Sequence, residues 1–124
     1  MTIIEAIAKL DAHKPNTYPQ EDKVDWLARL DHMIKNWIID THEGAETVTF
    51  TGYDEHTDLH TVLLVPAPFD DIYLRWMEAQ IDYHNGENEQ YNVSIIQYNT
   101  AYDAYANYYH RTHMPLSQGS RFVF

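Results

Sequence analysis

Four side chains that can bind a divalent cation occupy alternate positions in the middle of the chain, at Asp54, His56, Asp58 and His60. Alternate residues of an extended backbone project from one side, so an extended segment here would bring these imidazoles and carboxylates together. Nitrogen and oxygen ligands of this kind suit zinc and similar ions. The same residues also suit the polar tip of a β-hairpin. A small metal-binding module or metal-dependent enzyme that uses His56 and His60 with the neighbouring Asp residues is therefore one alternative function.

Two other histidine patterns are weaker candidates for metal ligands. His110 and His113 lie near the C-terminal end of a predicted helix, where a positive charge is favourable to the helix dipole without any metal. Residues 42–46, HEGAE, start like the zinc-protease pattern His-Glu-x-x-His. The second histidine of that pattern is missing, and Gly44 stands where the helix would have to continue.

The patterns that carry most other enzyme chemistry are missing from the sequence. It contains no Glu-x-x-His pair for a di-iron bundle, no glycine-rich phosphate loop and no Gly-x-Ser-x-Gly element. It has no cysteine and four glycines, which leaves no thiolate nucleophile, no disulfide and little material for phosphate-binding loops. We therefore expect a protein that is not an enzyme and needs no cofactor.

The charge of the chain argues against binding to nucleic acid. Eight Lys and Arg residues stand against nineteen Asp and Glu residues, which gives a net charge of −11. Such a surface repels a phosphate backbone. The acidic residues are spread along the chain, as on solvated helix faces, and they would also suit the wall of a channel through which DNA slides. An acidic regulatory protein that mimics DNA is a second alternative function.

Tyrosines recur with helical spacing towards the C-terminus. Six of the ten tyrosines lie between residues 91 and 109. One continuous stripe along a helix follows from their spacing, and its members are Tyr91, Ile95, Tyr98, Tyr102, Tyr105 and Tyr109. Tyrosine offers a large, stiff contact area with a hydroxyl that tolerates water. The stripe therefore predicts either the core seam of a helical bundle or a subunit interface.

Apolar periodicity and end signals predict about four helices, over residues 2–13, 19–43, 69–85 and 87–110. Thr2 and Glu5 form a capping box at the first start. The apolar stripe of the second helix includes Leu27, Leu30, Ile34, Trp37 and Ile38. The third helix carries two apolar stripes, which predicts a central position. The Asn85-Gly86 turn makes the third and fourth helices an antiparallel hairpin.

Between the second and third helices, the residue pattern changes to that of β-strands. Residues 47–53 and 59–65 alternate and are rich in β-branched side chains, which predicts an inserted β-hairpin over about 47–65. Two strands alone are marginal in water, so this hairpin must pack on the helices or pair with another chain.

One domain with a tail is expected from the length of 124 residues. The prediction is a mainly α fold, a small helical bundle over residues 1–110 with the inserted hairpin, followed by an extended C-terminal tail over 111–124. The tail contains Arg-Phe-Val-Phe at 121–124, and we expect it to dock either on a neighbouring subunit or back on its own bundle. No apolar run reaches the roughly 18 residues of a membrane span, and the first residues do not resemble a signal peptide.

Three segments resemble one family of viral proteins. They are VPAPFD at 65–70, IDYHNGE at 81–87 and YHRTHMP at 109–115, with weaker similarity at 14–16 and 25–43. Together they resemble small head–tail connector proteins, also called adaptor or head-completion proteins, of tailed phages and prophages of Gram-positive bacteria. The similarity covers most of the chain.

The resemblance implies a structural virion protein at the head–tail junction, made in the cytoplasm of the bacterial host. It implies a homo-oligomeric ring of about twelve copies beneath the portal protein. The ring would extend the DNA channel and join the head to the next neck or tail protein, and DNA would pass without sequence-specific binding and without any membrane. We expect the interfaces at residues of the hairpin, the tyrosine stripe and the tail: Phe50, Leu63, Tyr98, Tyr102, Tyr105, Tyr109, Phe122 and Phe124.

Overall fold

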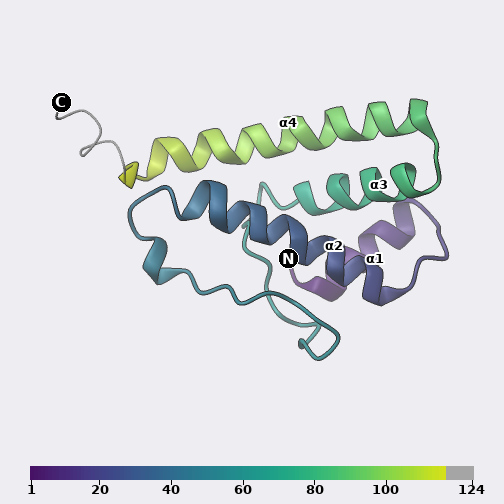
Figure 1. The fold of residues 1–124 in the computed structure, drawn as a ribbon, viewed down its shortest axis with the longest axis horizontal. Helices are drawn as coiled ribbons and strands as arrows, with labels where there is room; N and C mark the ends of the chain where they lie inside the picture. The colour runs from purple at the N-terminus through teal and green to yellow at the C-terminus, as the bar shows by residue number, and fades with distance from the viewer. Residues whose placement is uncertain (117–124) are drawn as a thin grey trace.

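A computed structural model of the chain describes residues 1–116, and in this range the chain is a small helical bundle (Figure 1). The predicted fold class, a mainly α protein with about four helices, is confirmed. A π-helical turn, η1 (Lys35–Ile39), continues the second α-helix, and a short 3-10 turn, η2 (Ala45–Thr47), follows. The α-helices are α1 (Ile3–His13), α2 (Gln20–Ile34), α3 (Ile72–His84) and α4 (Asn88–Thr112).

Local signals fix the helix ends much as the sequence predicts. The hydroxyl of Thr2 accepts a hydrogen bond from the Glu5 backbone N–H at 3.3 Å, and the Glu5 carboxylate accepts one from the Thr2 N–H at 2.9 Å. This is the expected capping box. Gly86 has a φ of 72°, a left-handed conformation that glycine adopts without strain, at the turn between α3 and α4. The two helices form the predicted antiparallel hairpin.

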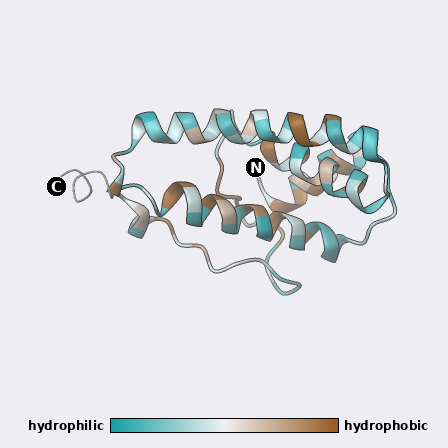
Figure 2. Ribbon diagram, turned by 45° about the horizontal axis from the view of Figure 1, so that its top comes forward, coloured by the Kyte–Doolittle hydropathy of each residue, from teal (hydrophilic) through white to brown (hydrophobic). Residues whose placement is uncertain are grey.

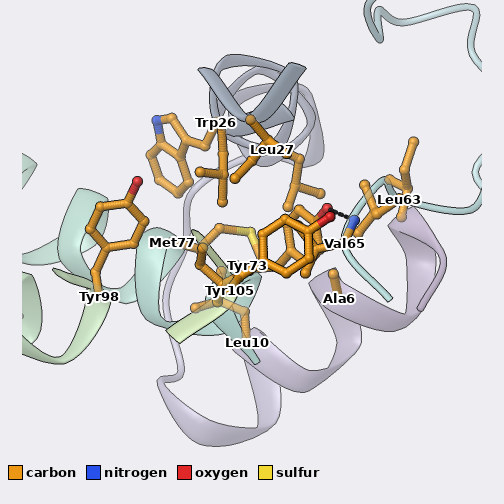
Figure 3. Close-up of a cluster of buried hydrophobic side chains, with 14 of the residues drawn as sticks. Ala6, Leu10, Trp26, Leu27, Leu63, Val65, Tyr73, Met77, Tyr98 and Tyr105 are labelled. Atoms are coloured by element: carbon orange, nitrogen blue, oxygen red, sulfur yellow. Dashed lines mark hydrogen bonds between the residues drawn. The ribbon is translucent and has the colours of Figure 1, made fainter. Parts of the chain in front are cut away.

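The core lies around α3, which packs against each of the other three α-helices (Figure 1). Figure 3 shows Tyr73 and Met77 of α3 between Leu10 of α1, Leu27 of α2 and Val65 of the connecting segment, all of them buried. The outward turns of α4 are mainly hydrophilic in Figure 2. The prediction that the third helix is central is thus confirmed, because α3 offers apolar side chains to neighbours on several sides.

The predicted β-hairpin is wrong, since residues 1–116 contain no β-strand. Residues 59–63 lie instead across the start of α1, where the Ile3 N–H donates to the Thr61 carbonyl at 3.1 Å and the Leu63 N–H to the Met1 carbonyl at 2.9 Å. Alternation here reflects an extended segment with one side on the helices. A free two-stranded ribbon would gain little stability, whereas the α1 N-terminus offers this segment both partners and apolar surface.

The start of the predicted tail continues α4 as far as Thr112. Residues 114–116 then pair briefly with residues 41–43 through an antiparallel bridge between His42 and Pro115. Residues 117–124 lie outside the described part of the chain. No helix in the described part is both long and apolar enough to cross a membrane.

Candidate functional site

The tyrosine stripe faces the interior of its own chain. Tyr98, Tyr105 and Tyr109 are buried and Tyr102 is half-buried. The Tyr98 ring lies 4.9 Å from that of Trp76. Burial raises the pKa of the Tyr98 and Tyr105 phenols above the ordinary value. Of the two alternatives for the stripe, the core seam is therefore the one formed within the chain, and the predicted role of these tyrosines in a subunit interface stays a prediction.

The other predicted interface residues differ in their placement. Leu63 is buried in the core, and Phe50 is half-buried, with its ring edge-on to His32 at 4.7 Å and to Tyr53 at 5.0 Å. Phe122 and Phe124 lie outside the described residues. The interface roles of all four residues stay predictions.

The residues of the metal hypothesis do not converge on one point. The Asp54 carboxylate accepts a hydrogen bond from the His56 backbone N–H at 2.8 Å, and the Asp58 carboxylate accepts one from the His60 N–H at 2.9 Å. Each carboxylate thus closes its own turn, as aspartate often does, and the backbone is not extended. Residues 1–116 contain no group of three or more His, Cys, Asp or Glu arranged to hold a metal ion.

A histidine pair lies where residues 114–116 meet the bundle. His42 is buried, with Nδ1 2.6 Å from the Ile38 carbonyl and Nε2 2.9 Å from Nδ1 of His110. A carbonyl oxygen only accepts, so Nδ1 of His42 donates, and a neutral His42 then accepts from the His110 N–H. The His113 ring stacks on Tyr109 with centroids 3.7 Å apart. These rings join the end of α4 to the end of η1, a link that sequence spacing could not reveal.

A buried carboxylate, Asp31 of α2, organises the segment that was predicted as a hairpin. Its oxygens accept hydrogen bonds from the hydroxyl of Tyr73 at 2.7 Å, from the hydroxyl of Tyr53 at 2.5 Å and from the Leu64 N–H at 3.2 Å. The Val65 N–H donates in turn to the Tyr73 hydroxyl at 2.7 Å (Figure 3). Burial raises the pKa of Asp31, although these donors act in the opposite direction.

A second buried carboxylate, Asp82 of α3, joins two other parts of the bundle. The ammonium of Lys14, just beyond α1, lies 2.8 Å from its Oδ1. The hydroxyl of Ser94 on α4 donates to its Oδ2. Sequence analysis missed both carboxylates. For Asp31 a signal existed, because it follows Leu30 and stands four positions after Leu27, within the apolar stripe.

One open groove lies on the outer flank of α4, and we call it the Ile96 groove. Its volume is about 420 Å³, and its lining includes Pro68, Phe69, Arg75, Ile96, Thr100 and Ala104. Ile96 is 63% exposed, and Val93 one turn earlier is 50% exposed. The helix therefore presents apolar side chains to the outside beside a single cation, Arg75, and the carboxylate of Asp71.

The other flank of α4 borders a second groove, which we call the Trp37 groove. It has a volume of about 270 Å³ and is lined by Met33, Trp37, Trp76, Tyr98, Asn99 and Tyr102. Trp37 was expected on the buried stripe of the second helix but is 63% exposed. The π turn η1 changes the register of side chains at this point, because each π turn holds more residues than an α turn.

No protein-family model, curated protein or solved structure matches this chain. The three segments on which the expected connector family rests, at 65–70, 81–87 and 109–115, lie just before α3, at the end of α3 with the α3–α4 turn, and at the end of α4.

Proposed function

We propose that this chain is a structural head–tail connector of a tailed phage, which assembles as a ring of about twelve copies under the portal protein. The observation that carries the proposal is the Ile96 groove, an open groove of mixed lining in which Ile96 is 63% exposed, on a chain with a net charge of −11. Exposed apolar surface on an acidic protein is typical of a contact with another protein. The resemblance of three segments to connector proteins supplies the identity of the assembly.

The groove suits a second copy of this chain. In a ring, each copy offers one surface to the next copy and a different surface to the previous one, so a groove need not match itself. Ile96 and Val93 would enter the interface from α4, and the Arg75 and Asp71 side chains would lie at its polar rim. The net negative charge would keep DNA from adhering to the channel wall.

Native mass spectrometry across a range of protein concentrations tests this function, because it reports copy number and bound metal together. A metal-free ring of many copies supports the connector. A monomer that carries a stoichiometric ion supports the metal-binding alternative with His56 and His60. A metal-free monomer calls for the same measurement with a portal ring added, where binding of many copies is the result expected.

A matched pair of variants tests the groove itself. Ile96→Asp places a charge in the groove and should convert rings into monomers. Val62→Asp is the control, because Val62 is 67% exposed but lies beside the α1 N-terminus, away from the groove. Rings that form equally well with Ile96→Asp would contradict the proposed interface, and monomers from both variants would show a general effect of added charge.

A further inference from the structure

The Trp37 groove is open in residues 1–116, although its lining is that of a core. Side chains of four elements meet there: Met33 from α2, Trp37 from η1, Trp76 from α3 and Tyr98 with Tyr102 from α4. Asn99 at its edge is exposed. A groove lined by aromatic rings and Met33 accepts large apolar side chains, and filling it would remove much of the exposed Trp37 surface from water.

The backbone of residues 114–116 is directed back towards this groove. The Glu43 N–H donates to the Met114 carbonyl at 2.7 Å, and the Leu116 N–H donates to the Thr41 carbonyl at 2.9 Å. The chain therefore runs from beside Glu43 to beside Thr41, which is towards η1. Thr41 in turn donates from its hydroxyl to the Trp37 carbonyl at 3.2 Å. The last described residue thus lies about one helical turn from Trp37.

We propose that Phe122 and Phe124 of the same chain fill the Trp37 groove. The eight residues 117–124 span up to about 26 Å when extended, whereas Tyr102 lies only about 15 Å along α4 from Thr112. Their sequence, SQGSRFVF, provides a polar and glycine-containing stretch followed by two aromatic side chains two positions apart. Side chains at that spacing project from the same side of an extended backbone.

The same chain is favoured over a second copy by proximity. A short tether gives the attached segment an effective concentration on the order of millimolar, which a free second copy reaches only at millimolar protein. Charge does not separate the two occupants, because Arg121 of either copy would approach the acidic Asp103 beside Tyr102. The inference goes beyond the connector function and does not depend on it, since the Ile96 groove is on the other flank of α4.

Disulfide trapping tests the contact, because the chain has no cysteine of its own. In Asn99→Cys/Ser120→Cys, one thiol is placed at the edge of the groove and the other two positions before Phe122, on the side of an extended segment from which Phe122 and Phe124 project. We expect a disulfide within one chain, seen as a faster-migrating monomer on a non-reducing gel. Thr100→Cys/Ser120→Cys is the matched control, because Thr100 is also exposed on α4 but lines the other groove. In this control the disulfide should form at about one tenth of that rate or more slowly.

A second comparison assigns the effect to the two phenylalanines. Adding Phe122→Ser/Phe124→Ser to Asn99→Cys/Ser120→Cys should slow trapping about tenfold, because the apolar contact that holds the segment is lost. Equal rates for the Asn99 and Thr100 pairs, or no effect of the serine changes, would overturn the proposal. A disulfide-linked dimer as the main product would also overturn it and would assign the groove to a second copy.

Discussion

Two buried carboxylates hold this small bundle together, and they are stabilised in different ways. Asp31 is surrounded by neutral donors, the hydroxyls of Tyr53 and Tyr73 and the Leu64 N–H. Asp82 faces a formal positive charge, the Lys14 ammonium, with one hydroxyl on its other oxygen. The comparison shows that a buried carboxylate can be held either by several dipoles or by one counter-ion, and that around Asp31 the dipoles offset desolvation only in part, because its pKa stays raised.

The largest effect is expected for the change that removes the Asp31 acceptor. In Asp31→Leu, the Tyr73 hydroxyl and the Leu64 N–H lose their acceptor inside the core. Each unsatisfied buried donor costs about 1–3 kcal/mol, so the free energy of unfolding should fall by about 3 kcal/mol or more. Urea denaturation followed by tryptophan fluorescence measures it. A loss below about 1 kcal/mol would show that this network is not a main support of the fold.

Removing the counter-ion of the other carboxylate should cost somewhat less. Lys14→Met leaves Asp82 buried and opposite an apolar side chain. Breaking a fully buried pair costs about 3–5 kcal/mol, and because the Lys14 side chain is 25% exposed we expect about 2 kcal/mol. The double variant Lys14→Met/Asp82→Asn should recover part of that loss in the same denaturation assay.

Lys23→Met is the control for this comparison. The Lys23 ammonium lies 2.7 Å from the Asp11 carboxylate, which is half exposed. Its removal leaves a carboxylate that water can solvate, so the loss through charge should be smaller than for Lys14→Met. Equal losses for the two lysine variants would mean that packing of the lysine stems, and not the buried charge of Asp82, sets the cost.

The helices could be predicted from the sequence because their signals are local. A capping box, a 3.6-residue apolar period and an Asn-Gly turn each act over a few positions. The hydrogen-bond network of Asp31 could not be predicted in this way, since its partners Tyr53 and Tyr73 follow Asp31 by 22 and 42 positions. The alternation in 59–65 predicts one strand of a hairpin, and this prediction is wrong, because the segment forms no strand and lies instead across the start of α1. The exposure of Trp37 depends on a π turn, for which the sequence carries no clear signal.

Within the Asp31 network, the two tyrosines should not be equivalent. Tyr53→Phe removes a donor from a half-buried position that water can reach, so about 1 kcal/mol should be lost. Tyr73→Phe should cost more, because the buried Val65 N–H also loses its acceptor. The two variants, measured side by side in urea, separate a single hydrogen bond from one that continues into the backbone. A reversed order would contradict the central place of Tyr73.

The smallest effect, a pH dependence, separates neutral donors from a counter-ion most directly. In the folded chain, burial raises the pKa of Asp31 above the ordinary aspartate value of 3.8. The Asp31 carboxyl therefore binds its proton more strongly in the folded state than in the unfolded state. The resulting stabilisation is complete below pH 3.8 and is lost as the pH rises through the folded pKa.

Asp31→Asn cannot titrate and serves as the reference for this effect. The measured quantity is the free energy of unfolding of the unmodified chain minus that of Asp31→Asn. This difference should fall as the pH rises, by at most about 1.4 kcal/mol per pH unit. A difference that rises with pH over this range would contradict this prediction. It would show that the tyrosine hydroxyls stabilise the charged carboxylate better than water does, as an ammonium partner would.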